Sequence, residues 1–502
     1  MRLLILILYV FASAKGFSQG TPFQHKFRII DRYIDSLMKE WNIPGLAMGI
    51  VYKDQYIYGK GYGYRHVEKK LPVETTTLFP IASNTKLFTT TLACMLDYEK
   101  QLILDKPVRF YLPLLNFNND ELNTKVTLRD MLSHRTGLPR YDGIWIASPM
   151  NRKDIVHSVS TMKPQLGFRE GYIYNNVMFA AAGAVIEKVV DTTWEVYTKK
   201  RIFQPLEMTS SCFSNEEMWL HNNYSLSYLQ PDSTGKLVPR KFQAQSDALG
   251  PAGTIKSNVE DMSHWMIAQL NGGQYKGRQV IPAGVISQTM VPHSIADKTS
   301  RWEELSNPLY GLGRIMQMYK GRKMAMHTGA IDGFFSNLTL LPFDSLGIFI
   351  IYNSETAGIL RSVIALPILD RLLGLSSTPW SERYRKDYLE FKVLQKRARD
   401  SINATQVKNT IPSHPLNNYT GLYHHPVYGE VHIALQQNQL QLLFRRQQSP
   451  LHHFHYDQFI TKEENNDHPD FRLHFLTNSK GEIDRFSMQP YSDPVVEFVK
   501  KK

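Results

Sequence analysis

The first part of the chain alternates between helix-like and strand-like spacing of its apolar residues. Residues 27–41 (FRIIDRYIDSLMKEW) carry apolar side chains three and four positions apart, which predicts an amphipathic helix that ends at Ile43-Pro44-Gly45. Residues 46–52 and 56–62 predict two strands, joined by a turn at 53–55. The pattern therefore indicates a mixed α/β beginning.

The middle of the chain is largely helical in pattern, with strands returning near its end. Helix-like runs such as 178–190 and 259–270 alternate with loops rich in glycine and proline. Residues 337–341 and 347–352 then predict two further strands. Two strands early and two late, with helices between them, predict one sheet assembled from both ends of a domain.

The C-terminal part has a different pattern. Residues 382–401 are charged with sparse apolar positions, which predicts a connecting helix or linker. Short alternating strands follow at 430–435, 439–444 and 471–476. We therefore expect a small, separate antiparallel β-domain at this end of the chain.

Composition and length bound the class of protein. A chain of 502 residues is too long for one compact core, so we expect two or three domains. With 42% hydrophobic and 21% charged residues it has ordinary globular composition, which excludes disordered, fibrous and multi-spanning proteins. The formal net charge of +12 is spread along the chain without basic–aromatic interleaving, so we expect no nucleic-acid partner.

The N-terminus has the pattern of a secretory signal peptide. A basic start at Arg2 precedes an apolar run at 3–12 and the small residues Ala12-Ser13-Ala14. The pattern predicts a signal peptide over 1–18 and export to the periplasm or the extracellular space, without a membrane span after cleavage. An uncleaved anchor remains the alternative.

The cysteines and histidines add little chemistry. The two cysteines, Cys94 and Cys212, make no disulfide framework, and the sequence leaves open whether they pair. His452, His453 and His455 cluster in the tail, but no acidic or cysteine ligand pattern accompanies them. We therefore expect a solvated loop there, and no metal or organic cofactor in the protein.

One serine–lysine pair stands at the start of an apolar, helix-like run, FPIASNTKLFTTTLA (79–93). Spacing i, i+3 places Ser83 and Lys86 on one helix face, and burial there can keep the lysine neutral, so that it accepts the serine proton. Ser-x-x-Lys also occurs at Ser36/Lys39, Ser160/Lys163 and Ser233/Lys236, where the surroundings favour surface residues. We expect Ser83 to be a nucleophile and Lys86 its base.

These residues carry a family resemblance. Residues 77–86 (TLFPIASNTK) resemble the nucleophile segment of the serine β-lactamase and penicillin-binding-protein family, most closely the class C-like branch with its D-alanyl-D-alanine carboxypeptidases and related esterases. Residues 61–64 (GYGY) and 128–140 (LRDMLSHRTGLPR) are similar to that branch as well. The resemblance implies an α/β (α+β) fold, in which helices flank an antiparallel sheet beside a helical subdomain.

The resemblance also implies the domain organisation. A hydrolase domain over 22–376 and a helical linker over 377–411 would follow the signal peptide. The tail over 412–502, with YTGLY at 419–423, resembles the lipocalin-like β-domain that is appended to this branch.

A second motif of the family is Tyr-x-Asn, here Tyr174-Asn175-Asn176. The resemblance implies that Tyr174 shuttles the proton of Ser83, since neighbouring cations would favour its phenolate. Asn176 would hold the substrate amide and hydrogen-bond to Lys86. Tyr172 competes for the role of Tyr174, but it lacks an asparagine two residues on.

The third motif is Lys-Thr-Gly in true β-lactamases and His327-Thr328-Gly329 here. The resemblance implies an edge strand on which Gly329 lets the substrate approach, while the N–H groups of Ala330 and Ser83 form an oxyanion hole. Strand-like sequence does not surround the similar Arg135-Thr136-Gly137. Histidine is only partly charged near neutral pH, which argues against an efficient β-lactamase.

The function implied is that of an exported serine hydrolase. It would act through an acyl-enzyme on peptides, amides or esters, above all small peptides with D-residues of cell-wall origin. The alternatives are a class C-like β-lactamase, a binding protein or sensor of the same fold without turnover, and a structural envelope protein. The loops 142–154 and 218–245, which we expect to select the substrate, follow no pattern that identifies it. The oligomeric state and the role of the tail stay open.

Overall fold

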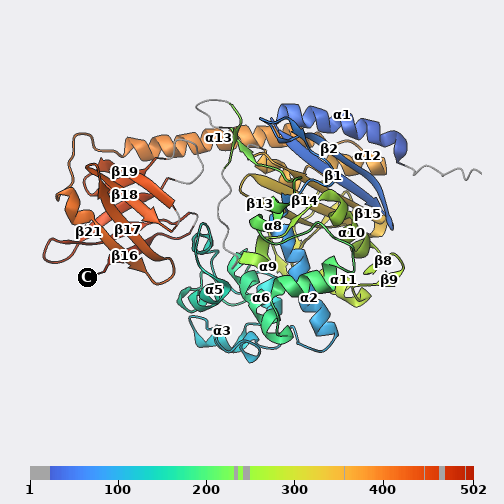
Figure 1. Ribbon diagram of the computed structural model, residues 1–502, viewed down its shortest axis with the longest axis horizontal. Helices are drawn as coiled ribbons and strands as arrows, with labels where there is room; N and C mark the ends of the chain where they lie inside the picture. Colours follow the sequence, from blue (N-terminus) through green and yellow to red (C-terminus); the bar gives the residue numbers. More distant parts are fainter. Residues whose placement is uncertain are drawn as a thin grey trace, which may run out of the picture.

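The computed structural model describes residues 23–230, 236–240, 249–355, 357–445, 447–462, 470–491 and 493–501. The predicted signal peptide and part of the 218–245 loop lie outside these residues. Figure 1 shows a large sheet covered by helices, a helical region below it, and a separate β-barrel. The predicted fold class is confirmed.

The large sheet is antiparallel and has nine strands within the described residues. In spatial order they are β10 (Ser294–Ile295), β11 (Leu309–Tyr310), β12 (Ile315–Tyr319), β13 (Arg322–Ile331), β14 (Phe334–Leu341), β15 (Leu346–Tyr352), β1 (Gly45–Tyr52), β2 (Gln55–His66) and β3 (Leu71–Pro72). β1 pairs with β15 from Leu46↔Tyr352 to Tyr52↔Leu346. The sheet is thus assembled from both ends of the domain, as predicted.

Both faces of the sheet are covered, which explains the continuous apolar runs in its central strands. Leu46, Met48 and Ile50 of β1 pack with α1 (Gln24–Glu40) and α12 (Leu366–Leu373). The alternate residues Ala47 and Val51 pack on the other face with α2 (Thr85–Tyr98) and α10 (Val259–Leu270). The side-chain period of two in a strand divides one apolar segment between two cores.

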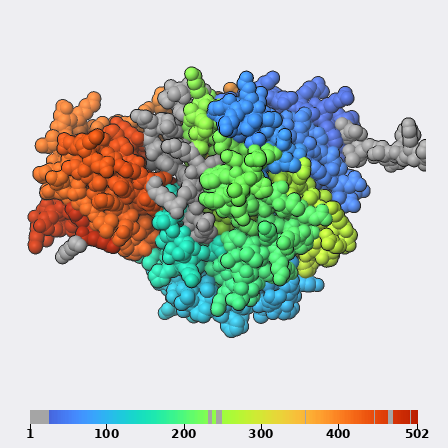
Figure 2. Space-filling view, viewed as in Figure 1, coloured from blue at the N-terminus to red at the C-terminus, as the bar shows by residue number. Residues whose placement is uncertain are grey.

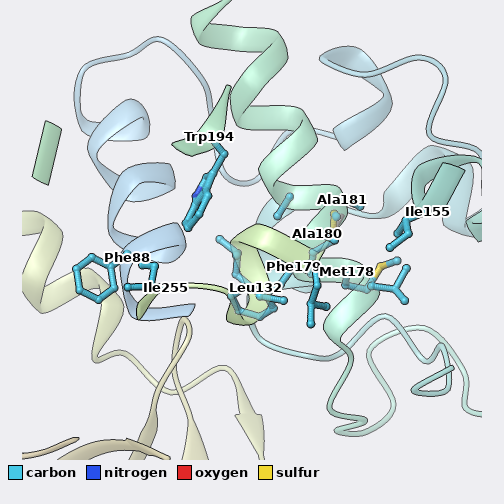
Figure 3. Packing of buried hydrophobic residues seen from close by; sticks show 14 of the residues in the cluster. Phe88, Leu132, Ile155, Met178, Phe179, Ala180, Ala181, Trp194 and Ile255 are labelled. Carbon is cyan, nitrogen blue, oxygen red and sulfur yellow. The ribbon is translucent and has the colours of Figure 1, made fainter. Parts of the chain in front are cut away.

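The helical region packs against α2 and fixes the segment that begins with Ser83. Its helices are α3 (Asp120–Lys125), α4 (Leu128–Leu132), α5 (Arg152–Ser158), α6 (Asn176–Val190), α7 (Trp194–Thr198), α8 (Asn215–Leu220), α9 (Gly250–Gly253) and α11 (Ala283–Thr289). Figure 3 shows apolar side chains from these elements in one cluster, among them Phe88, Leu132, Ile155, Met178, Phe179 and Trp194.

The described part of this domain also has three two-stranded ladders: β4 (Phe79–Pro80) with β7 (Lys256–Ser257), β5 (Tyr228–Leu229) with β6 (Val238–Pro239), and β8 (Gln274–Tyr275) with β9 (Arg278–Gln279). The ladder of β4 with β7 lies directly before Ser83. It therefore holds the chain that enters α2.

The long helix α13 (Trp380–Ala404) leads from the sheet to the C-terminal domain (Figure 1). That domain is a closed antiparallel barrel of β16 (Gly421–His425), β17 (Gly429–Gln436), β18 (Gln439–Phe444), β19 (Gln447–His455), β20 (Gln458–Thr461), β21 (Arg472–Thr477), β22 (Ile483–Met488) and β23 (Val496–Lys500). Aromatic side chains pack inside it: the rings of Phe486 and Phe498 stack 5.1 Å apart, and Phe475 lies 5.4 Å from Phe486. The barrel interior is therefore a packed core.

The expectation of a solvated loop at His452, His453 and His455 is wrong, because all three lie in the barrel strand β19 and His455 is buried. Cys94 and Cys212 are buried free thiols. His455 accepts the backbone N–H of Val407, and His453 bonds to the carbonyl of Tyr456. Among the described residues, no group of three or more His, Cys, Asp or Glu side chains has a metal-binding arrangement. No helix in the described part of the chain is long and apolar enough to cross a membrane.

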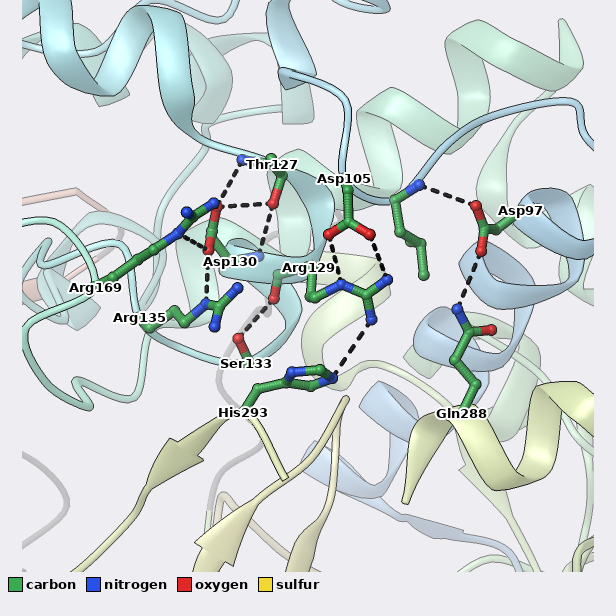
Figure 4. A network of polar contacts seen from close by, with 11 residues as sticks. Asp97, Asp105, Thr127, Arg129, Asp130, Ser133, Arg135, Arg169, Gln288 and His293 are labelled. Atoms are coloured by element: carbon green, nitrogen blue, oxygen red, sulfur yellow. Dashed lines mark hydrogen bonds and ion pairs between the residues drawn. The ribbon is translucent and has the colours of Figure 1, made fainter. Parts of the chain in front are cut away.

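A buried carboxylate holds the loop that follows α4 (Figure 4). Asp130 is fully buried, forms a capping box with Thr127, and accepts hydrogen bonds from Arg135 at 2.6 Å and from Arg169 at 2.8 and 2.9 Å. Burial opposes ionisation of Asp130, but the bonds from Arg169 and Thr127 outweigh it and lower its pKa. This network ties residues 127–137 to the segment before Tyr174.

We predict that Asp130→Asn lowers the free energy of unfolding by about 1–3 kcal/mol at neutral pH, because two arginines lose their carboxylate. Since the folded-state pKa is depressed, this stabilisation is present above the ordinary value of 3.8 and is lost only as the pH falls below it. Denaturant unfolding at several pH values measures the effect. The control is Asp105→Asn, which breaks an exposed pair with Arg129. An equal loss in both variants would contradict the prediction.

Candidate active site

Ser83 and Lys86 lie at the entrance to α2, as their spacing predicts. Ser83 belongs to a single turn of 3-10 helix, η1 (Ala82–Asn84), that leads into α2, and it is half-buried. Lys86 is fully buried, and its Nζ lies 3.2 Å from Ser83 Oγ. Ala82 takes the left-handed conformation (φ 50°), which is uncommon for a non-glycine residue and turns the chain directly before Ser83.

The surroundings of Lys86 favour its neutral form. Its Nζ donates to Asn176 Oδ1 and to the carbonyl of Ala252, both at 2.7 Å. Burial lowers the pKa of Lys86 well below its ordinary value, and Arg140 lowers it further, against a smaller opposing effect of Asp142. A neutral amine that donates to two carbonyl oxygens keeps its lone pair for Ser83. Lys86 can therefore act as a base.

Tyr174 lies beside this pair. Lys86 Nζ lies 4.8 Å from its ring, and the Ser83 hydroxyl is near enough to affect its pKa. Burial raises the pKa of Tyr174, more than the Ser83 hydroxyl and the charge of Arg140 lower it. The expectation of a favoured phenolate is therefore wrong: Tyr174 is a neutral phenol. Tyr172, the competing residue, packs 5.3 Å from the ring of Tyr310.

Asn176 is held by a residue that the sequence did not single out. While its Oδ1 accepts from Lys86, its Nδ2 donates to Asp142 Oδ1 at 2.9 Å. Asp142 also accepts from Arg140 at 2.7 Å and from Trp145 Nε1 at 3.0 Å. Both polar ends of the Asn176 amide are thus engaged within the protein, and not only the end that faces Lys86.

Two buried histidines flank Tyr174. The ring of His327 lies 6.3 Å from that of Tyr174, and its Nε2 lies 3.1 Å from the Tyr310 hydroxyl. Its Nδ1 lies 2.7 Å from the carbonyl of Thr328, to which it donates. Burial lowers the pKa of His327 to about 3, so it is neutral at physiological pH and not partly charged as the residue type alone suggests. A proton on the neighbouring Lys86 would lower the pKa of His327 further.

The second of these histidines, His134, was missed by the sequence reasoning. Its Nδ1 accepts the backbone N–H of Asn175 at 3.0 Å, and its ring lies 4.4 Å from that of Tyr174. Burial lowers its pKa well below the ordinary value. His134 stands within the 128–140 segment, whose resemblance was noted as a whole without a role for any one residue.

The strand β13 carries His327, Thr328, Gly329 and Ala330 past η1. β13 is not an edge strand of the whole sheet, because β12 pairs with its first half. That ladder ends at Ile315↔Met326, so on this side the described residues give the rest of β13 no partner strand. The site therefore has the free strand edge that the motif implied. This edge exists because β12 is shorter than β13, and not because β13 is the last strand of the sheet.

Gly329 is required by close packing against η1. A Cβ built there would lie 2.3 Å from the carbonyl oxygen of Ile81 and 2.4 Å from Ser336 Oγ. Ser336 in turn donates to the same Ile81 oxygen at 2.8 Å and accepts from Asn84. The glycine thus brings β13 against the backbone that carries Ser83, in addition to any role toward substrate.

The other Ser-x-x-Lys pairs are not comparable sites. Ser36 and Lys39 are exposed on α1, Lys163 is exposed after α5, and Ser233 lies outside the described residues. Arg135, in the similar Arg-Thr-Gly run, is paired with Asp130.

We predict that Gly329→Ala lowers the free energy of unfolding by about 1–3 kcal/mol, because its methyl group meets backbone that cannot move aside freely. Gly284→Ala, where no atom lies within 4 Å of the added Cβ, is the control. Thermal and denaturant unfolding compare the two variants. A wild-type stability for Gly329→Ala would show that the contact between β13 and η1 is looser than described.

The chain is similar to known proteins in sequence and in fold. The chain matches the family model described as Beta-lactamase over residues 30–363, and a domain of unknown function (DUF3471) over residues 405–500. Unguisins hydrolase ungD' of Aspergillus campestris is 27% identical over 442 residues, or 84% of this chain and 79% of that protein. Protein flp of Staphylococcus aureus is 26% identical over 330 residues, or 64% of this chain and 62% of that protein.

Solved structures share the fold. The octameric penicillin-binding protein homologue from Pyrococcus abyssi is 22% identical with a TM-score of 0.62, over 94% of this chain and all (100%) of that chain. SurE is 17% identical with a TM-score of 0.57, over 95% of this chain and 99% of that chain. Since the family model spans more than half of the sequence and includes every site residue above, the chain belongs to the Beta-lactamase family, with the fold of serine β-lactamases and penicillin-binding proteins.

Proposed function

We propose that the protein is a serine hydrolase that works by acyl transfer, with Ser83 as nucleophile and Lys86 as general base. The observation that carries this proposal is the buried Lys86 amine, which donates to two carbonyl oxygens and lies 3.2 Å from Ser83 Oγ. Membership of the Beta-lactamase family and a relative named as a hydrolase support it.

The reaction begins when Ser83 Oγ attacks the substrate carbonyl carbon and its proton passes to Lys86. Tyr174 gives its proton to the leaving amine or alcohol, and the Lys86 ammonium returns a proton to Tyr174. Water then attacks the acyl-enzyme while the same groups take its proton and return one to Ser83 Oγ. The products are a carboxylic acid and free enzyme, so the cycle needs no further reactant.

The backbone N–H groups of Ser83 and Ala330 stabilise the oxyanion in this proposal. The contact of Gly329 with Ile81 brings the two segments together. A substrate backbone lies along the free edge of β13, where extended peptides can add as a strand. Asn176, with its amide already engaged, acts on Lys86 and the shape of the site rather than as a free donor to substrate.

The substrate class is peptides, amides and small esters, above all peptides that contain D-residues. A neutral His327 replaces the lysine of true β-lactamases, so the site has no permanent cation at that position for a substrate carboxylate. This argues against efficient β-lactam turnover. SurE, a protein of the same fold, has a crystal structure with D-Leu, which is consistent with D-residue recognition. The pattern at 1–18 supports export to the periplasm or the extracellular space.

We predict that Ser83→Ala abolishes turnover of short-chain nitrophenyl esters and D-amino-acid peptides, with kcat/KM falling on the order of 10³-fold or more. Ser36→Ala, the exposed serine of the same short motif, is the control and stays fully active. Equal activity of wild type and Ser83→Ala would refute the nucleophile. A stable adduct on Ser83 without turnover would favour a binding protein, and rapid penicillin turnover a β-lactamase.

The pH dependence tests the base. Because Lys86 acts when unprotonated and its pKa is lowered, kcat/KM falls only as the pH drops through that lowered value, well below the ordinary 10.5. Lys86→Arg, whose guanidinium keeps its proton, is inactive at every pH. Steady-state kinetics across the pH range measures both. Activity that rises up to pH 10.5 would contradict a neutral lysine.

A further inference from the structure

The loop over residues 139–150 supplies Asp142 to the site and has a strained backbone. Tyr141 and Ala147 take left-handed conformations with φ of 47° and 49°, although neither is glycine. Such conformations persist when surrounding contacts hold them. The contacts on the outer side of this loop come from the C-terminal barrel.

One carboxylate of the barrel binds the loop backbone directly. Asp493 is buried; its Oδ1 accepts the N–H of Asp142 at 3.0 Å, and its Oδ2 accepts the N–H of Gly143 at 2.7 Å. Tyr428 of the barrel donates its hydroxyl to the same Oδ2 at 3.1 Å. A Cβ at Gly143 would lie 2.7 Å from that oxygen, so only glycine allows this approach without displacement.

A second group of the barrel fixes the loop a few residues on. Arg445 donates to the carbonyl of Ile146 at 2.9 Å. Figure 2 shows the barrel, in orange, against the teal part of the hydrolase domain. Side chains of the barrel thus bond to N–H groups and to a carbonyl group of the loop backbone. The two domains are therefore joined at this loop as well as through α13.

Two further hydrogen bonds connect the contact of Asp493 with Asp142 to the proposed base, Lys86. Asp142, whose N–H Asp493 accepts, accepts from Asn176 Nδ2, and Asn176 Oδ1 accepts from Lys86. Each step is a hydrogen bond between buried groups, where low dielectric strengthens it. The position of the Asp142 backbone therefore affects the acceptors that keep the Lys86 lone pair directed at Ser83.

We propose that Asp493 is a positioning residue for the hydrolase reaction, supplied by the C-terminal barrel, which holds the 139–150 loop so that Asp142 and Asn176 orient Lys86. The proposal rests on the proposed function and gives the barrel a part in catalysis. Asp493 does not contact substrate. It acts through the loop.

The ionisation of Asp493 makes this role depend on pH. The titratable groups that face it are Asp142 and Tyr141 on the loop and Tyr428 and Arg445 on the barrel. Burial raises the pKa of Asp493 to about 6, with Asp142 raising it and the N–H of Gly143 opposing the rise. Above this value the carboxylate accepts both N–H groups; below it a protonated oxygen weakens one of them.

The test is Asp493→Asn in the full chain, with ester hydrolysis measured from pH 5 to pH 9. We expect kcat to fall about tenfold at pH 8 with KM changed less than about twofold, because the base is displaced and substrate contacts are kept. The ratio of wild-type to variant kcat falls toward one near pH 5, where both carry a neutral side chain. A ratio that does not change with pH, or an unchanged kcat, overturns the proposal.

Two controls separate this role from a loss of stability and from a failure of the proposed function. Asp457→Asn removes a barrel carboxylate that accepts from Ser413 and Tyr419 within the barrel region, and it keeps the wild-type kcat. Ser83→Ala in the same assay shows whether the turnover is that of the proposed site. A loss in Asp457→Asn equal to that in Asp493→Asn overturns the proposal.

A readout without turnover completes the test. Hydrogen exchange in the peptide that contains Asp142 and Gly143 is faster in Asp493→Asn than in wild type at pH 8, since their N–H groups lose an acceptor. This result is expected whether or not a substrate has been found. Unchanged protection overturns the proposal even if the hydrolase activity is confirmed.

Discussion

The burial of one lysine amine is the constraint on which the site depends. Lys86 has no exposed surface, and two carbonyl oxygens take its N–H groups. A charged ammonium in this place would have no directly paired carboxylate among the described residues, so burial favours the neutral amine. A neutral amine next to a serine can accept the serine proton, whereas a charged ammonium can only donate hydrogen bonds. The fold therefore allows Lys86 to act as a base by burying its amine.

The rest of the domain supplies the two acceptors and keeps them in place. Asn176 begins α6, and Ala252 lies in α9. These helices meet where Gly183 faces Pro251, since a Cβ at Gly183 would lie 2.1 Å from Pro251 Cγ. The apolar cluster between α2 and α6 (Figure 3) therefore does more than stabilise the domain, because it fixes Asn176 relative to Lys86.

Local pattern predicted the sheet and the pair of Ser83 with Lys86, whereas the fold class also needed the family resemblance. The strands at 46–52 and 347–352 could be predicted because buried strands are continuous apolar runs, and the motif spacing placed Ser83 beside Lys86. The two-residue strands such as β10 and β11 have no pattern of their own. Asp142 and Asp493 could not be found, because their contact joins positions 351 residues apart. The neutral state of His327 depends on burial, which residue type does not reveal.

The most direct test of the account is the pKa of Lys86 in the folded protein. Carbon-13 labelling of lysine side chains, with Lys86→Met to assign the signal, gives the titration of the Lys86 Cε resonance by NMR. The account predicts a midpoint well below the ordinary 10.5, with the amine neutral when the enzyme is active. A Lys86 resonance that titrates near 10.5 would contradict the claim that a buried neutral lysine activates Ser83.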